Sequence, residues 1–216
     1  MNQDLLNQKD YWDGQVSDFD SIYAHNKSRF DNWIDATFRW DIYARYDYAM
    51  EHSEPIQGRA FLDVGCATGR YALEFARRGA SRVVGIDISE KMLTVCNQRA
   101  RLEHLEDRCA FVHTDLTQYQ PDAQFDVCTG IGLFDYIRDA GPVLSKMRNV
   151  VSDRAIMSFP RFWTWRAPIR KVRLALRQCD VYFYTQEHID ALLKQAGFKR
   201  YELKQVGQLY CVVAFV

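Results

Sequence analysis

The stretch from Ala60 to Met92, AFLDVGCATGRYALEFARRGASRVVGIDISEKM, constrains the fold more than any other part of the sequence. It has, in order, the pattern of a buried strand, a glycine turn, a helix and a second strand (residues 60–64, 65–69, 70–78 and 82–86). Apolar runs that are bounded by glycines and alternate with a helical pattern are typical of a βαβ unit in a parallel sheet. The turn offers backbone N–H groups at a helix start to a polar ligand. Asp87, after the second strand, can accept hydrogen bonds from both hydroxyls of a ribose. The stretch therefore predicts a nucleoside-binding site.

The spacing of the glycines in the turn distinguishes between kinds of nucleoside ligand. A dinucleotide-binding turn has glycines at its first, third and sixth positions, because a pyrophosphate must approach the helix start closely. Here these positions hold Gly65, Ala67 and Arg70, and the second glycine of the turn is Gly69. The large side chain of Arg70 makes a nicotinamide-dependent oxidoreductase the least expected class.

The sequence FLDVGCATG, followed in order by VVGIDIS, FVHTDL and FDVCTGIGLFDYI, resembles the motifs of class I S-adenosylmethionine-dependent methyltransferases over about residues 60–159. The resemblance implies a single-domain, Rossmann-like α/β fold with a seven-stranded, mostly parallel sheet, a C-terminal antiparallel hairpin and an N-terminal helical lid. It also implies S-adenosylmethionine as cofactor and S-adenosylhomocysteine as product. One departure is Ala67, where most of the family has glycine. Alanine is small, so we expect the loop to be preserved.

The resemblance assigns cofactor contacts to the ends of the first, second, third and fourth strands. Asp87 would bind the ribose, Asp115 would accept a hydrogen bond from the adenine amino group, and the backbone of Leu116 would meet the ring. The expected cofactor-binding residues are Asp63, Gly65, Cys66, Ala67, Gly69, Asp87, Ile88, Met92, Thr114, Asp115, Leu116, Gly130, Ile131 and, from an aromatic lid segment at Phe19–Tyr23, Tyr23. Asp115 could instead be a turn or cap aspartate, and we expect His113 to be an ordinary packed histidine.

The acceptor side of the site is expected after the fourth strand, where LFDY follows the loop Gly130–Gly132. Many small-molecule methyltransferases carry a histidine or glutamate near the acceptor there. Asp135 and Tyr136 match those positions and are the candidate catalytic residues, as a base or as an acceptor contact. The alternative for Asp135 is a residue that starts a helix. Because the cofactor already carries a reactive sulfonium, the family has no universal catalytic residue.

The segment at about residues 160–184 is the least generic part of the chain. Between Asp153 and Asp180 the chain has no acid but seven basic residues, counted from just before the segment: Arg154, Arg161, Arg166, Arg170, Lys171, Arg173 and Arg177. The segment follows the fifth strand, where the family inserts acceptor-binding elements, so we expect a pocket wall for an anionic, partly apolar acceptor. The expected substrate contacts are Phe134, Arg161, Trp163, Trp165 and Arg166. The alternatives are a solvated amphipathic helix over the sheet and a membrane-surface or nucleic-acid patch. The segment and the following YTQEHIDALLKQAGF are similar to magnesium-protoporphyrin and quinone-pathway O-methyltransferases.

Around this core the sequence predicts an N-terminal helical lid over residues 1–52 and a methyltransferase core over residues 53–216. The lid would include a helix from Ser28 to Met50 with an apolar stripe, whose polar members Arg39, Tyr43 and Arg45 could reach the ligands. The other expected elements are helices at 90–102, 141–150 and 186–196, strands at 109–113, 125–129 and 154–159, and a hairpin of 200–205 with 210–216.

Composition narrows the class of partner. The 28 basic residues equal the 28 acidic ones, so no global charge attracts nucleic acid. No run approaches the roughly 18 apolar residues of a membrane span. The start of the chain has no charged and then apolar leader. The six cysteines show no paired short spacing, so we expect free thiols and no metal site.

The sequence therefore predicts a cytoplasmic enzyme, monomeric or homodimeric, that methylates a small-molecule acceptor, with oxygen as the favoured target atom. A nucleic-acid methyltransferase is an alternative, although the fourth motif reads CTGI, without the acid or asparagine and paired prolines of amino-methylating DNA enzymes. A protein methyltransferase and a non-catalytic, methyltransferase-like binding subunit are further alternatives.

Overall fold

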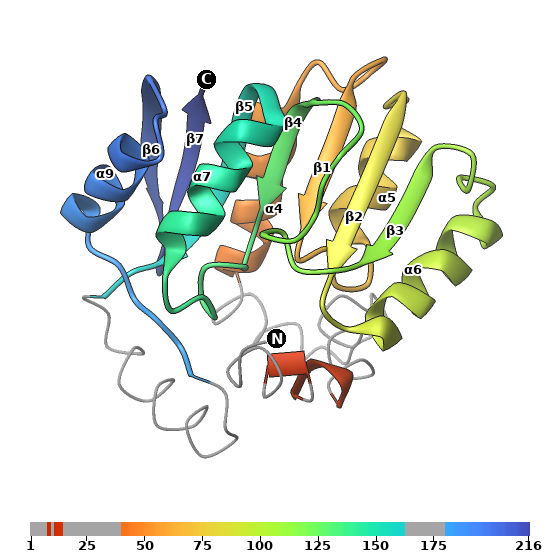
Figure 1. Ribbon diagram of the computed structural model, residues 1–216, viewed down its shortest axis with the longest axis horizontal. Helices are drawn as coiled ribbons and strands as arrows, with labels where there is room; N and C mark the ends of the chain where they lie inside the picture. Colours follow the sequence, from red (N-terminus) through yellow and green to blue (C-terminus); the bar gives the residue numbers. More distant parts are fainter. Residues whose placement is uncertain (1–7, 10, 15–39, 163–179) are drawn as a thin grey trace.

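The computed structural model describes residues 8, 9, 11–14, 40–162 and 180–216, and these form a single α/β unit (Figure 1). Its seven strands are β1 (Ala60–Val64), β2 (Arg82–Asp87), β3 (Cys109–His113), β4 (Phe125–Gly130), β5 (Val151–Pro160), β6 (Arg200–Val206) and β7 (Leu209–Phe215). They lie in the order β3-β2-β1-β4-β5-β7-β6. Neighbours from β3 to β5 are parallel, whereas β7 is antiparallel to both β5 and β6. This is the predicted Rossmann-like sheet with its C-terminal hairpin.

The strand order reverses between β1 and β4. The chain moves outward from β1 through β2 to β3, and then returns to pair β4 with the other side of β1. In open parallel sheets, ligands bind beyond the carboxyl ends of the strands at such a switch point. The topology therefore places the site beyond the ends of β1, β2 and β4.

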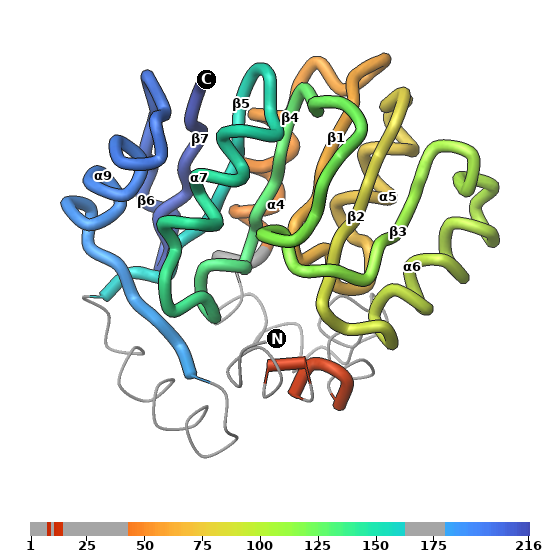
Figure 2. The backbone as a smooth tube through the Cα atoms, viewed as in Figure 1, coloured from red at the N-terminus to blue at the C-terminus, as the bar shows by residue number. Residues whose placement is uncertain are grey.

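Helices cover both faces of the sheet. They are α4 (Trp40–Ser53), α5 (Arg70–Arg77), α6 (Glu90–Leu102), α7 (Ala140–Val150) and α9 (Gln186–Gln195). Side chains of α4 and α5 share one core cluster with Phe61, and those of α7 and α9 share a second with Leu62. Because successive side chains of a strand point to opposite faces, neighbours such as Phe61 and Leu62 belong to different clusters. The smooth trace in Figure 2 shows α4 and α5 behind the sheet and α7 in front of it.

Most of the expected element boundaries are confirmed. Ser89 caps α6 by accepting a hydrogen bond from the Met92 N–H at 3.2 Å, and Thr185 caps α9 in the same way. β5 begins at Val151 rather than at Arg154. The polar residues after Val151 concealed its start, and a register shift separates the pairs that Phe125 and Val127 form with β5. For the predicted long N-terminal helix, the structure describes α4 from Trp40, and the start at Ser28 lies outside the described residues.

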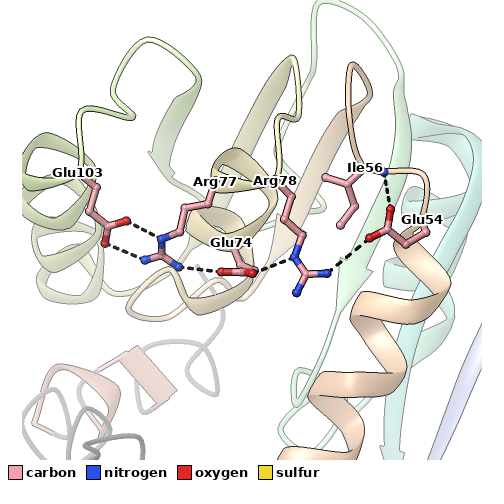
Figure 3. Close-up of polar contacts among 6 residues, drawn as sticks. All are labelled: Glu54, Ile56, Glu74, Arg77, Arg78 and Glu103. Atoms are coloured by element: carbon pink, nitrogen blue, oxygen red, sulfur yellow. Dashed lines mark hydrogen bonds and ion pairs between the residues drawn. The ribbon is translucent and has the colours of Figure 1, made fainter.

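A chain of ion pairs ties the helices together on the amino-terminal side of the sheet (Figure 3). Arg77 of α5 binds both carboxylate oxygens of Glu103, with N···O distances of 2.6 and 2.7 Å. Glu74 joins Arg77 at 3.0 Å to Arg78 at 2.8 Å, and Arg78 reaches Glu54 at 3.5 Å. The network connects the end of α6, the helix α5 and the loop after α4. No helix in the described ranges is long and apolar enough to cross a membrane.

Candidate functional site

The glycine turn after β1 forms the floor of the site. Gly65, Ala67 and Gly69 all have left-handed backbones, with φ of 68°, 47° and 83°. The positive φ of Gly65 favours glycine, and a Cβ there would also make a tight contact of 3.1 Å with Cδ1 of Leu133. The positive φ at Ala67 explains why glycine is the usual residue in the resembled motif, because other L-residues rarely adopt it. The loop nevertheless forms with alanine, as expected.

Asp87 links the turn to the start of α6. It is the last residue of β2; its Oδ2 accepts a hydrogen bond from the Ala67 N–H, and its Oδ1 accepts one from the Ser89 N–H, both at 2.9 Å. Burial raises the pKa of this carboxyl, against the lowering effect of the backbone N–H groups that face it. Each oxygen keeps a second lone pair for a further donor. The side chain is therefore held in place, with acceptors for a pair of hydroxyls.

Asp63 lies deeper, beneath the turn. Its side chain is buried, and Oδ1 accepts a hydrogen bond from the Thr129 hydroxyl at 2.7 Å. Oδ2 has no hydrogen bond of ordinary geometry among the described residues, although the Ala72 N–H faces the carboxyl. Burial raises the pKa of Asp63 to about 7, even though the Thr129 bond lowers it. A buried oxygen without a donor is costly, so its position suits a cationic or N–H group of a ligand.

The β3 end carries the predicted adenine contacts. Asp115 Oδ1 accepts hydrogen bonds from the N–H of Thr117 at 2.6 Å and from its hydroxyl at 2.5 Å. Asp115 thus acts as a turn aspartate, the alternative to an adenine contact. Leu116 is buried, and the Thr114 N–H donates to the carbonyl of Asp87 at 3.1 Å. His113 differs from expectation, because it is exposed rather than packed, with Nε2 2.9 Å from the carbonyl oxygen of Ile88.

The loop after β4 closes the other side of the turn. Ile131 is buried, and the Gly132 N–H donates to the Ser158 hydroxyl at 2.8 Å. A Cβ on Gly132 would lie 3.1 Å from Nη1 of Arg45, so this guanidinium of α4 lies against the loop. The polar side of α4 therefore reaches the carboxyl edge of the sheet.

The residues predicted to contact the acceptor differ in how far they are buried. Phe134 is fully buried and stacks on Phe159 with ring centroids 4.4 Å apart, so the described structure gives it a packing role. Asp135 is also buried, and its carbonyl accepts a hydrogen bond from the Tyr182 N–H at 2.9 Å. Tyr136 is half-buried at the edge of the sheet. Their contacts with an acceptor, and a catalytic role for Asp135 or Tyr136, stay predictions.

Arg161 lies at the carboxyl end of β5 but is directed toward the hairpin. Its Nη1 donates to the carbonyl of Gly207 at 2.8 Å, and its guanidinium carbon lies 5.4 Å from the ring centroid of Tyr210. Both partners belong to the side of β5 that is away from β4 and β1. Its predicted substrate contact stays a prediction. Four further predicted site residues, Tyr23, Trp163, Trp165 and Arg166, lie outside the described residues.

The sequence reasoning expected a lid over residues 1–52 but named no site residue in the N-terminal segment, defined here as residues 8, 9 and 11–14. Figure 1 shows it beyond the carboxyl ends of β1, β2 and β4. The Gln8 side-chain amide donates to the carbonyl of Tyr136 at 2.6 Å, and Trp12 packs edge-on against the Tyr136 ring at 5.0 Å. At its other end Asp13 accepts a hydrogen bond from the Ser89 hydroxyl. The pair Tyr11-Trp12 within a polar stretch was the available signal.

Among the residues that the structure describes, no group of three or more His, Cys, Asp or Glu side chains could hold a metal ion. The five cysteines in the described ranges are free thiols.

Comparisons with known proteins agree with this geometry. Residues 61–154 match a family described as a methyltransferase domain. The chain is 31% identical over 116 residues to a tRNA U34 carboxymethyltransferase of Haemophilus influenzae, a match that covers 54% of this chain and 36% of that protein. It is 33% identical over 118 residues to a ubiquinone biosynthesis O-methyltransferase of Neisseria meningitidis, covering 53% of this chain and 48% of that protein. The chain thus spans less than half the length of either relative.

Among solved structures, the magnesium protoporphyrin IX methyltransferase of Synechocystis, crystallised with bound S-adenosylhomocysteine, matches with a TM-score of 0.77 and 21% identity. The match covers 99% of both chains, so the whole fold is shared, including the C-terminal hairpin. Residues 61–154 therefore match a methyltransferase domain, and the chain has the class I, Rossmann-like methyltransferase fold.

Proposed function

We propose that this protein is an enzyme that moves a methyl group from S-adenosylmethionine to an oxygen of an anionic or aromatic small molecule and releases S-adenosylhomocysteine. The observation that carries the proposal is Asp87, fixed between the Ala67 and Ser89 N–H groups at the end of β2. A carboxylate in this position suits the two hydroxyls of a ribose. The glycine turn beside it departs from the dinucleotide pattern, because Ala67 and Arg70 occupy the positions of its second and third glycines.

The other polar groups at this edge fit the remaining parts of the cofactor. The unpartnered Oδ2 of Asp63 would receive a donor from the ammonium of the methionyl group, and Arg45, against Gly132, would pair with its carboxylate. Leu116, with the Asp115 turn, would bound the adenine. Each assignment matches a charge or an apolar surface that the described residues supply at the switch point of the sheet.

When bound, the cofactor supplies a methyl group on a positively charged sulfur, so the transfer itself needs little from the protein. The protein would hold the acceptor atom in line with the methyl group at about 3–3.5 Å and exclude water. Tyr136, which is half-buried and packs against Trp12, would contact the acceptor. A base is needed only where the acceptor is a hydroxyl of high pKa, because a phenolate or carboxylate is already deprotonated.

The names of two of the similar proteins support a small-molecule acceptor, since one acts in ubiquinone biosynthesis and the other on magnesium protoporphyrin IX. The equal numbers of acidic and basic residues agree with this, because a nucleic-acid enzyme benefits from a broad basic face. A lid over residues 1–52, a core over residues 53–216 and a cytoplasmic location complete the proposal. The similarity to a tRNA-modifying enzyme favours RNA as the second candidate substrate.

Turnover with methyl-labelled S-adenosylmethionine tests the proposal. The purified protein would be incubated with separate pools of quinols, phenols, carboxylated tetrapyrroles and unmodified tRNA, and mass spectrometry would follow label and S-adenosylhomocysteine. We expect label in a small molecule and S-adenosylhomocysteine in equal amount. Label in tRNA alone would overturn the small-molecule assignment. Cofactor binding without turnover on any pool would support the non-catalytic alternative.

A further inference from the structure

Ser89 connects two carboxylates at the start of α6. Its N–H donates to Asp87 Oδ1 at 2.9 Å, and its hydroxyl donates to Asp13 Oδ1 at 2.5 Å. The same hydroxyl caps the helix by accepting the Met92 N–H. Ser89 is fully buried, and the Asp13 side chain is only 15% exposed. A short hydrogen bond from a hydroxyl to a carboxylate, away from water, belongs to the charge-assisted kind that is about twice as strong as a neutral one.

The surroundings of Asp13 keep its carboxylate ionised. Burial raises its pKa, but the Ser89 hydroxyl and the Lys9 ammonium, which is 3.1 Å away, together bring the pKa below its ordinary value. Lys91 donates to the backbone carbonyl of Asp13 at 3.4 Å. The amino terminus of α6 also favours a negative charge at this place. The Ser89 hydroxyl, the Lys91 ammonium and the start of α6 therefore hold this end of the N-terminal segment against α6, while Lys9 supports the charge of Asp13 from within the segment.

The N-terminal segment is also attached to the loop after β4, through Gln8 at its start and through Trp12, which packs on Tyr136. The segment thus joins the two loops that border the glycine turn, one on the predicted ribose side and one on the predicted acceptor side. A ligand bound on the turn would lie beneath it. Opening of one of the two attachments would therefore give such a ligand a way out.

We propose that Asp13 is a positioning residue, which, through Ser89, holds the N-terminal segment closed over the nucleoside and slows its release. The inference rests on the proposed function, because it takes Asp87 as the ribose acid. It goes further by naming the contact that sets the lifetime of the bound cofactor or product. Asp13 acts through Ser89, so the two side chains should form one energetic unit.

The experiment measures the dissociation rate of S-adenosylhomocysteine by surface plasmon resonance on the full-length protein. Asp13→Ala removes the contact, whereas Asp13→Asn keeps a carbonyl acceptor for the Ser89 hydroxyl without the charge. Asp190→Ala is the matched control, because Asp190 makes the same kind of i,i+4 ion pair, with Lys194 on α9, away from the site. Thermal melting of each variant accompanies the rates, since a merely structural role would lower the melting temperature without a specific effect on release.

We expect Asp13→Ala to speed release by about tenfold or more, the size expected for one charged hydrogen bond. Asp13→Asn should have a smaller effect, and Asp190→Ala none. In a Ser89→Ala background, Asp13→Ala should add little, because the partner is already gone. If Asp13→Ala leaves the release rate unchanged while Asp87→Ala weakens the affinity for S-adenosylhomocysteine, this inference is overturned and the proposed function is not. If Asp87→Ala also has no effect, the proposed function fails with it.

Discussion

Gly85 of β2 couples the stability of the sheet to the shape of the cofactor turn, and substitution by alanine tests that coupling. Gly85 pairs with Asp63 on one side and Phe111 on the other. A Cβ added here would lie 2.7 Å from Cδ1 of Phe111 and 2.9 Å from Sγ of Cys66. Ordinary contacts lie at about 3.5–4.0 Å, so both neighbours must move by nearly an ångström. Cys66 belongs to the turn, so its displacement would reach the cofactor site.

We expect Gly85→Ala to lower the free energy of unfolding by about 2 kcal/mol, within the usual cost of overpacking a core. For a domain of this size the melting temperature should fall by about 4–8 °C. The affinity for S-adenosylhomocysteine should fall as well. Urea denaturation and calorimetry measure the two effects. Phe111→Leu in the same chain should recover part of the stability, because the shorter side chain gives up the ring atoms that clash.

Gly141→Ala is the matched control for this substitution. Gly141 lies in the first turn of α7, and a Cβ there would meet only Oδ1 of Asp139, at 3.3 Å. Alanine is the better helix former, so Gly141→Ala should be neutral or stabilising. A Gly85→Ala protein that unfolds within about 0.5 kcal/mol of the wild type, the range of ordinary surface substitutions, would refute the packing argument.

Two further predictions concern charged groups. Glu74→Gln should lower the free energy of unfolding, measured by urea denaturation, by at most about 1 kcal/mol, and by less at high salt, because the network of Figure 3 is partly exposed. The affinity for S-adenosylhomocysteine should not change. A loss of affinity would contradict a purely structural role for Glu74. Burial raises the pKa of Asp63 from its ordinary value of 3.8 to about 7, so the folded protein binds more protons than the unfolded chain across that interval. The free energy of unfolding of the ligand-free protein should therefore fall as the pH rises through this interval, and Asp63→Asn should make the fall shallower. If urea titrations show the same dependence on pH for both proteins, Asp63 keeps an ordinary pKa.

The fold could be predicted because its signals are local. The glycines around β1 and β2, and the caps Ser89 and Thr185, each fix an element boundary within a few residues. β5 was the exception, because Ser152 and Asp153 interrupt its apolar pattern, and its start depends on pairing with β4 and β7. Pairing partners that lie far away along the chain leave no signal in a local window.

The site could be predicted only in part, for the same reason. Asp87 follows from its place directly after a strand, whereas the direction of Arg161 depends on Gly207 and Tyr210, which come some 46 residues later. The N-terminal segment contacts Ser89, Lys91 and Tyr136, which all lie far away along the chain. Contacts of this kind depend on the assembled sheet and could not be derived from spacing.

The most direct test of the account is calorimetric titration of the protein with S-adenosylhomocysteine, for the wild type and for Asp87→Ala, with NADH as the comparison ligand. Two charge-assisted hydrogen bonds to ribose hydroxyls contribute about 1.5–3 kcal/mol each, and part of this is recovered by water in the variant. We therefore expect Asp87→Ala to weaken S-adenosylhomocysteine binding about tenfold to a thousandfold with the melting temperature retained. NADH should bind negligibly to both proteins. Preferred binding of NADH, or equal affinity of both proteins for S-adenosylhomocysteine, would contradict the account.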